Sequence, residues 1–177
     1  EGRLACGDVG KGRLCSGETI LEKMCDALTE KDLLNKNVLV TAGPTQEYMD
    51  PVRYITNPSS GKMGYALAKN AKRRGAKVTL VSGPVNLQAP VGVEVVNVKS
   101  ALQMYDEVMK RCESADIIVK SAAVGDFRPK GYSEHKLKKD AVGIIELEKN
   151  PDILAAVCQK AKKAVVIGFC METRDLK

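Results

Sequence analysis

A polar loop that follows a buried strand carries the residue types that bind anions. Segment 37–64 reads NVLVTAGPTQEYMDPVRYITNPSSGKMG, with apolar residues first and a helix start at its end. In an open α/β sheet, ligands bind beyond the carboxyl ends of the strands, where helix N-termini present unpaired N–H groups. The segment therefore predicts an enzyme site for an anion. The candidates for phosphate contact are Gly43, Ser59, Ser60, Gly61 and Lys62.

Two familiar phosphate-binding motifs do not match this loop. A Walker A loop needs a glycine five residues before Gly61 and Ser or Thr after Lys62, but the chain has Thr56 and Met63 there. A dinucleotide fingerprint needs three closely spaced glycines after the first strand, and only Gly43 stands there before Gly61. Lys62 is therefore not a P-loop lysine, and a nicotinamide cofactor is unsupported.

The apolar pattern predicts the elements that position this loop. The run at 38–40 is typical of a strand covered on both faces, and strands then alternate with helices. We expect an α/β fold, a Rossmann-like three-layer sandwich with a mostly parallel central sheet. The expected strands are 38–42, 77–82, 93–98, 115–120, 142–147 and 164–169, and the expected helices are 61–74, 101–113 and 151–162.

Local signals refine the expected site. Ser59 and Ser60 are good N-caps for the helix at 61–74, and Gly75 ends that helix as a C′ glycine. The strand at 115–120 delivers its following residues to the same sheet edge as the first loop. The lysine-rich loop at 127–140 exceeds about 12 residues, a length typical of functional or disordered loops.

Composition excludes several classes of protein. A chain of 177 residues suits one domain with a substantial core plus a tail. It holds no apolar run near the roughly 20 residues of a membrane helix and no signal-peptide pattern, so we expect a cytoplasmic protein without a membrane partner. The net charge of +6 comes with only 4% aromatic residues, which leaves nucleic acid binding unsupported. A basic cleft for phosphates accounts equally well for the charge.

Cysteine spacing does not predict a metal site. The six cysteines contain no C-x-x-C pair, and His135 is the single histidine of the sequence, so a zinc site is not expected. Cys112, Cys158 and Cys170 lie in apolar contexts, where free cysteine usually behaves as a small buried hydrophobe.

Five segments carry a family resemblance, and they occur in the family's order. They are 41–64, SAAVGDFRPK at 121–130, KLKK at 136–139, NPDIL at 150–154 and VIGFCMET at 166–173. The chain resembles the ligase half of the bacterial bifunctional phosphopantothenoylcysteine decarboxylase/phosphopantothenate-cysteine ligases, in the DNA/pantothenate metabolism flavoprotein family. The resemblance implies a ligase domain at 36–177, which in the family usually continues further.

The N-terminus is similar to the end of the decarboxylase half of the same family. The resemblance makes residues 1–35 a remnant of the decarboxylase clamp plus a linker, with Cys6 at the position of the catalytic cysteine. The FMN-binding domain that precedes this segment in the family is not in the sequence. We therefore expect FMN only in that domain, and no role for Cys6 in this chain.

The resemblance implies a reaction that joins 4′-phosphopantothenate to L-cysteine. CTP first converts the carboxylate into an acyl-cytidylate, and the cysteine amine then displaces CMP. Mg²⁺ and a homodimer formed through the ligase domain are implied as well. The alternative is a folded but inactive nucleotide-binding fragment of such a protein. An NAD(P)-dependent reductase is disfavoured by the missing glycines.

The resemblance also implies residue roles. Lys136 assists acyl-cytidylate formation, while Asn57 and Arg53 act in turning the intermediate into product. Ala122 and Ala123 act with them through backbone N–H groups or close approach. Without the resemblance, Lys136 reads as a solvated loop lysine, Asn57 as a turn residue and Arg53 as a surface charge.

Four further residues are candidates for nucleotide contact. Asp126 is expected at the ribose hydroxyls and Phe169 at the base, with Lys138 and Lys139 as supporting charge. The plain structural alternatives are an Asx turn for Asp126 and a core aromatic for Phe169.

Overall fold

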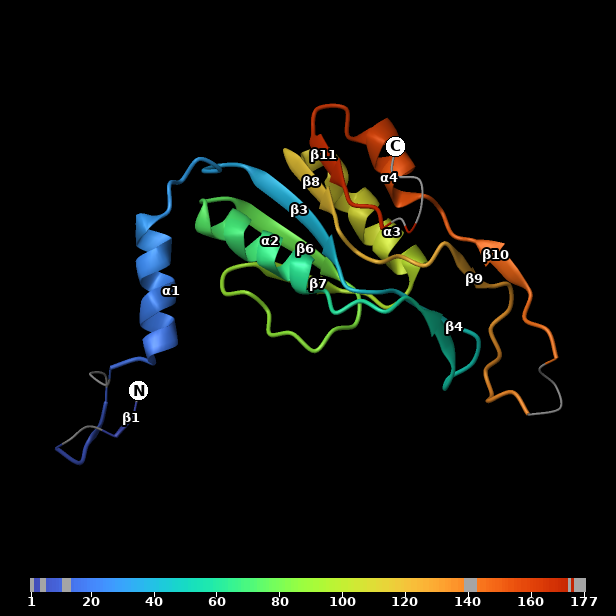
Figure 1. The fold of residues 1–177 in the computed structure, drawn as a ribbon, viewed down its shortest axis with the longest axis horizontal. Coiled ribbons are helices and arrows are strands. Elements are labelled where there is room, and N and C mark those ends of the chain that lie inside the picture. Colours follow the sequence, from blue (N-terminus) through green and yellow to red (C-terminus); the bar gives the residue numbers. More distant parts are fainter. Residues whose placement is uncertain (1, 4–5, 11–13, 139–142, 172, 174–177) are drawn as a thin grey trace.

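A five-stranded, all-parallel sheet forms the centre of the computed structural model, which describes residues 2–3, 6–10, 14–138, 143–171 and 173. The strand order is β11-β8-β3-β6-β7 (Figure 1). This confirms the predicted α/β fold with a mostly parallel sheet. The strands are β3 (Asn37–Ala42), β6 (Lys77–Ser82), β7 (Glu94–Asn97), β8 (Ile117–Lys120) and β11 (Val165–Gly168).

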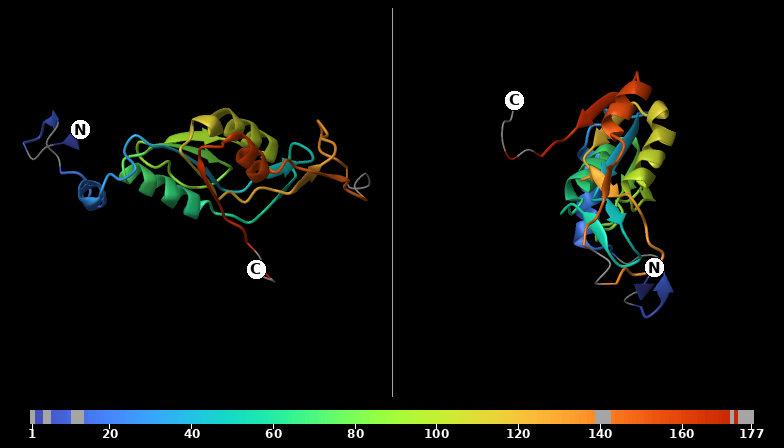
Figure 2. Two further views of the ribbon diagram at one scale, coloured as in Figure 1. Left: turned by 90° about the horizontal axis from the view of Figure 1, so that it is seen from above. Right: turned by 90° about the vertical axis from the view of Figure 1, so that its right-hand side faces the viewer.

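Helices cover both faces of the sheet, as the alternation of strand side chains requires. Val38 and Val40 of β3 pack with α2 (Lys62–Arg73). Leu39 points to the opposite face and packs in the cluster that contains α3 (Ala101–Arg111) and α4 (Ile153–Lys160). Figure 2 shows α2 and α3 on opposite sides of the sheet. The molecule is therefore the three-layer sandwich expected from the sequence.

Two antiparallel strand pairs form an arm that projects from the sheet (Figure 1). β4 (Gln46–Tyr48) pairs with β5 (Tyr54–Thr56), and β9 (Phe127–Pro129) pairs with β10 (Leu147–Lys149). We use "the arm" for residues 46–56, 127–138 and 143–149. The predicted strand 142–147 was wrong in its described part, because 143–146 are not strand and β10 begins at Leu147, where pairing with β9 fixes the register.

The first helix, α1 (Gly17–Leu28), lies outside the sandwich and buries none of its residues. It follows the short strands β1 (Gly2–Arg3) and β2 (Val9–Gly10). Ion pairs join Glu22 to Lys69 and Asp26 to Arg73 of α2. The predicted division at residues 35 and 36 stays a prediction. Within the described ranges, no helix is long and apolar enough to cross a membrane.

Three local predictions were wrong and two are confirmed. The N-cap of α2 is Gly61, with φ +73°, rather than Ser59 or Ser60, because the chain enters the helix in the left-handed conformation. Gly75 does end the helix, with φ +96°. Cys112 is buried as expected, but Cys158 on α4 and Cys170 beyond β11 are both exposed.

Candidate active site

A cavity of about 520 Å³ lies at the carboxyl edge of the sheet, between the start of α2 and the segments that follow β8 and β11. It contains seven residues predicted for the site, namely Ser59, Ser60, Gly61, Lys62, Ala122, Ala123 and Phe169. We call this cavity the cradle. Its lining is completed by Pro58, Met63, Gly64, Ser121, Cys170 and Met171.

The backbone of α2 packs closely against β3 at the carboxyl edge of the sheet. A Cβ added to Gly64 would lie 2.5 Å from Ala42 Cβ and 2.7 Å from Ser121 Oγ, so only glycine lets the helix pack against β3 here. Gly43 and Gly61 both have positive φ, and the Cβ position of Gly61 lies 3.3 Å from Gly43 N. The first turn of α2 therefore forms a wall of the cradle, where helix N–H groups lack intrahelical partners and favour an anion.

The backbone amides of the alanine pair donate within the protein. Ala122 N donates to Thr41 Oγ1 at 3.2 Å, and Ala123 N donates to Gly43 O at 2.9 Å. Both amides are thus occupied within the protein. Of the two contributions expected of the alanines, N–H groups or close approach, these hydrogen bonds favour close approach. Their small side chains line the cradle.

Phe169 lines the cradle, whereas Asn57 is not among its lining residues. Asn57 precedes the lining residues, and its Nδ2 donates to Val124 O at 3.3 Å. Phe169 is 51% exposed, so the core-aromatic interpretation was wrong and its ring is accessible to a ligand. Among the hydrogen bonds of the described residues, the Asp126 carboxylate takes part in none, and its backbone oxygen accepts from Asn150 N at 2.8 Å. Asp126 is exposed and no Asx turn is seen in that part of the chain.

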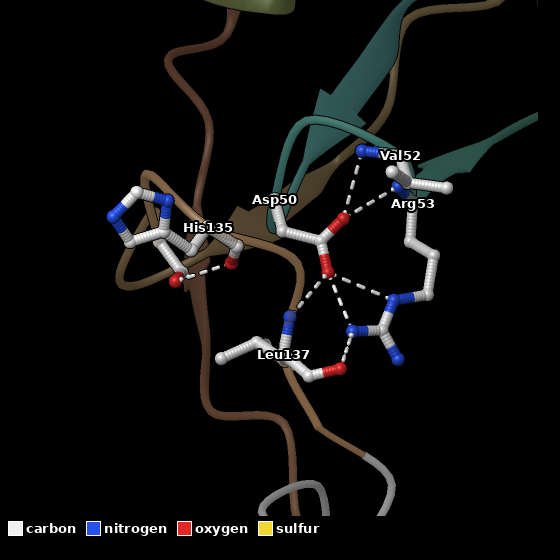
Figure 3. Close-up of polar contacts among 6 residues, drawn as sticks. Asp50, Val52, Arg53, His135 and Leu137 are labelled. Atoms are coloured by element: carbon white, nitrogen blue, oxygen red, sulfur yellow. Dashed lines mark hydrogen bonds and ion pairs between the residues drawn. The ribbon is translucent and has the colours of Figure 1, made fainter.

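A predicted residue of the arm, Arg53, lies in a cluster around the buried carboxylate of Asp50 (Figure 3). Arg53 Nε and Nη2 donate to Asp50 Oδ2 at 2.8 and 2.5 Å. Leu137 N donates to the same oxygen at 3.2 Å, and Leu137 O accepts from Arg53 Nη2 at 2.8 Å. Arg53, whose side chain is 35% exposed, is therefore paired with a buried carboxylate rather than being the free surface charge of the plain alternative.

The environment of Asp50 favours its ionised form. Burial acts to raise the pKa of this carboxyl, but the hydrogen bonds from Arg53 and from the N–H groups of Val52, Arg53 and Leu137 outweigh it. The pKa of Asp50 is held far below its ordinary value of 3.8. The carboxylate is charged at neutral pH, so the ion pair with Arg53 is intact.

Two exposed lysines of the loop flank Leu137. Lys136 directly precedes Leu137, and Lys138 follows it. Within the described part of the chain neither forms an ion pair, and Lys139 lies outside the described residues. Of the predicted residues, seven line the cradle, and Arg53, Lys136 and Lys138 lie in the arm. Gly43, Asn57 and Asp126 belong to neither set, and Lys136 is not among the cradle's lining residues.

Sequence reasoning missed two buried acids of the arm. Asp50 stands three residues before Arg53, a spacing that a turn can close, and this signal could have found it. Glu47 is 3% exposed and its Oε1 accepts from Ala101 N at 2.9 Å, at the start of α3. No local pattern marks Glu47, because its partner lies 54 positions away.

The cradle does not by itself offer a metal site. Its lining contains hydroxyl groups but no carboxylate, the ligand that usually joins Mg²⁺ to a protein. Among the described residues, no group of three or more His, Cys, Asp or Glu side chains could hold a metal ion. The residues present therefore do not fit a resident Mg²⁺ held by the protein alone.

The fold and the cradle together define an α/β protein with a cavity at the carboxyl edge of a parallel sheet, where ligands bind in folds of this class. Residues 33–177 match the model of the DNA/pantothenate metabolism flavoprotein C-terminal domain family. The chain belongs to this family, which confirms the resemblance read from the sequence.

Named relatives agree with the family. The chain is 49% identical, over 99% of its length, to the coenzyme A biosynthesis bifunctional protein CoaBC of Vibrio parahaemolyticus, and 47% identical to that of Bacillus subtilis over 100%. It spans 45% of the length of each of these relatives. A crystal structure of the C-terminal domain of a CoaBC protein is 44% identical, with a TM-score of 0.73 over 84% of this chain and 70% of that one.

The aligned region includes the N-terminal segment. Cys6 is exposed there, and its Sγ lies 3.8 Å from Asp8 Oδ2. Figure 1 shows this segment at the end of the molecule opposite the arm. Cys6 is therefore not part of the cradle, and its lack of a role in this chain stays a prediction.

Proposed function

We propose that this chain is a phosphopantothenate-cysteine ligase domain, which joins 4′-phosphopantothenate to L-cysteine through a CTP-derived acyl-cytidylate. One observation carries the proposal: residues from three distant segments, near positions 60, 122 and 169, line a single cavity at the helix N-terminus. Family membership supplies the reaction class. The relatives named above are coenzyme A biosynthesis proteins.

In the first step, a carboxylate oxygen of 4′-phosphopantothenate attacks the α-phosphorus of CTP. The new P–O bond forms as the bond to pyrophosphate breaks, which gives the acyl-cytidylate and free pyrophosphate. Both reactants are anions, so cationic groups are needed to offset their repulsion. We assign triphosphate contact to the first turn of α2 with Lys62, to Gly43 behind it, and to Lys136 of the arm, with Lys138 and Lys139 adding charge.

In the second step, the amine of L-cysteine attacks the acyl carbon. The C–N bond forms, the bond to the CMP phosphate oxygen breaks, and the amine loses a proton. Asn57 can donate to the oxyanion that develops, since one hydrogen of Nδ2 remains after its bond to Val124 O. Arg53 can reach a ligand with Nη1, because its Nε and Nη2 are held by Asp50.

Recognition of the nucleotide completes the proposal. We place the base against the exposed ring of Phe169 and the ribose near Asp126, with Ala122 and Ala123 permitting close approach. Mg²⁺ is proposed only as the ion that accompanies the triphosphate, since the cradle lacks carboxylates.

We propose a homodimer that forms through the ligase domain. Large apolar side chains are exposed along the arm, including Val52 at 57%, Tyr132 at 60% and Ile144 at 89%. An exposed apolar surface of this kind is typical of a protein interface. The cytoplasmic location expected from the sequence stays a prediction.

The second candidate is a nucleotide-binding module without turnover. It is favoured by the position of Lys136, which lies in the arm and not in the lining of the cradle. In this case the chain would bind CTP but would not release pyrophosphate.

Mass spectrometry of the purified protein with 4′-phosphopantothenate, CTP and Mg²⁺, with and without cysteine, separates these candidates. Acyl-cytidylate without cysteine, and phosphopantothenoylcysteine once cysteine is added, are the expected products. CTP binding without intermediate would favour the second candidate. If CTP did not bind, both would be wrong.

A further inference from the structure

The backbone of the lysine loop is fastened on both sides of Lys136. On one side, Ser133 N donates to Met49 O at 3.0 Å, and Ser133 Oγ donates to His135 O at 2.7 Å. On the other side, Leu137 is held through its N–H by Asp50 and through its carbonyl by Arg53. Lys136 thus lies between two fastened backbone positions, and its side chain is exposed.

The two oxygens of Asp50 have different partners. Oδ1 accepts from Val52 N and Arg53 N, both at 2.8 Å, and so closes the turn between β4 and β5. Oδ2 accepts from the Arg53 guanidinium and from Leu137 N, and so joins that turn to the lysine loop. One carboxylate therefore couples two segments that are 87 positions apart in the sequence.

We propose that Asp50 is a positioning residue of the ligase, which acts through Arg53 and Leu137 to hold Lys136 where it meets the triphosphate. This rests on the function proposed above. We call Asp50, Arg53 and Leu137 the clasp. The clasp is buried at Asp50, whose side chain is 0% exposed, and there an ion pair is screened far less than at a surface. Asp50 itself contacts no reacting atom.

Asp50→Asn opens the clasp selectively. The retained carbonyl oxygen can still accept from the turn, whereas an amide NH₂ in place of Oδ2 would face three N–H donors. We expect the maximal rate of pyrophosphate release without cysteine to fall about 10-fold to 100-fold, because small misplacements of a catalytic group have effects of this size. The KM for CTP should change much less, since the cradle is not altered.

A surface ion pair provides the matched control. Arg74 Nε and Nη2 donate to Asp32 Oδ1 and Oδ2 at 2.8 and 2.5 Å, so the same two guanidinium nitrogens pair with a carboxylate that lies outside the arm. Asp32→Asn should leave the rate of pyrophosphate release within about twofold, as expected for an exposed pair. An equal loss in both variants would overturn the proposal.

A double-mutant cycle separates positioning from general structural damage. If Asp50 acts through Lys136, then Asp50→Asn should add little to the loss caused by Lys136→Gln. If the rate loss in the double variant equalled the product of the two single losses, the proposal would be overturned. Should Asp50→Asn fail to fold, Leu137→Pro removes the same N–H donor from the loop side and leaves the turn of the hairpin intact, and the same cycle applies.

Hydrogen exchange tests the clasp without turnover. The Leu137 amide should exchange faster in Asp50→Asn than in the wild-type protein and in Asp32→Asn. If the Leu137 amide exchanged at the same rate in all three proteins, the proposed role of the clasp would be overturned, even if the enzyme were active. If the wild-type protein released no pyrophosphate, the proposed function would fail, and the exchange result would still decide whether Asp50 holds the loop.

Discussion

The cradle and the arm hold their residues by different physical means. The cradle is shaped by backbone: Gly64 packs against β3, and the amides of Ala122 and Ala123 donate to the segment that ends β3. The arm depends on the charge of one buried carboxylate, Asp50. A backbone-shaped site is sensitive to added atoms, whereas a clasp is sensitive to the loss of one charge. Substitutions can therefore change the two regions separately.

The largest effect is expected when the lysine of the arm loses its charge. Lys136→Gln should lower the rate of pyrophosphate release by on the order of 100-fold to 1000-fold, because a preorganised group that stabilises transition-state charge is removed. Single-turnover assays of pyrophosphate without cysteine measure this. If Lys136→Gln released pyrophosphate at the wild-type rate, Lys136 would have no part in the mechanism, and the residues of the cradle would have to account for the first step.

A matched change two residues along the loop sharpens this result. Lys138→Gln removes one exposed charge from the same segment. It should raise the KM for CTP and keep most of the maximal rate, as expected for supporting charge. If Lys138→Gln lowered the maximal rate as much as Lys136→Gln, the general positive charge of the loop, rather than one positioned lysine, would account for the activity.

A change at Asn57, which directly precedes the cradle's lining residues, should slow the second step of the reaction. Asn57→Ala should slow product formation by about 100-fold, because a donor to the oxyanion is lost, while acyl-cytidylate accumulates. Mass spectrometry of quenched reactions follows both species. Product formation at the normal rate would contradict the role of Asn57. The thermal unfolding midpoint serves as the control, since the bond to Val124 O is lost as well.

Atoms added where α2 packs against β3 should lower the stability of the fold around the cradle. Gly64→Ala places a Cβ 2.5 Å from Ala42 Cβ and 3.0 Å from Thr41 O, so α2 must move away from β3. We expect the free energy of unfolding to fall by about 1–3 kcal/mol, as for overpacked cores. Urea denaturation measures it. Gly131→Ala, in the arm, is the control, because its Cβ meets no atom within 4 Å. Equal stability of the two variants would contradict the close contact.

The smallest expected effect is on the stability of the fold at acidic pH. The pKa of Asp50 in the folded protein lies below its ordinary 3.8, so the unfolded chain binds more protons in that range. The stabilisation from Asp50 is therefore complete well above pH 4 and is lost as pH falls below about 4 toward the folded-state pKa. Urea denaturation between pH 6 and 2.5 should show a shallower loss of stability in Asp50→Asn than in wild type. Parallel curves would contradict this.

The sequence predicted the elements with strong local signals. The core strands β3 and β6 lie within one residue of their expected bounds, because continuous apolar runs identify buried strands. The three-residue strands β4, β5 and β9 were missed, since they are short, partly polar and formed by pairing with distant segments. The left-handed entry at Gly61 was missed as well, because Ser59 and Ser60 resemble ordinary caps.

The candidate site was predictable only in part. The loop after β3 pointed to an anion site from residue types alone, and the end of that loop, residues 58–61, lines the cradle. The contact of Asp50 with Leu137 spans 87 positions, so no local pattern could reveal it. The orientation of the Ala122 amide depends on Thr41 Oγ1 in a neighbouring strand.

Hydrogen bonding between the loops after β3 and β8 also bears on how the domain can diverge. Pro44 and Ala123 form a parallel bridge, and Gly125 N donates to Thr45 Oγ1 at 2.9 Å, so the two loops run in register beyond the sheet. An insertion in one loop would shift every later pair unless the other loop lengthened equally. The loops beside the cradle should therefore keep a constant length among homologous domains.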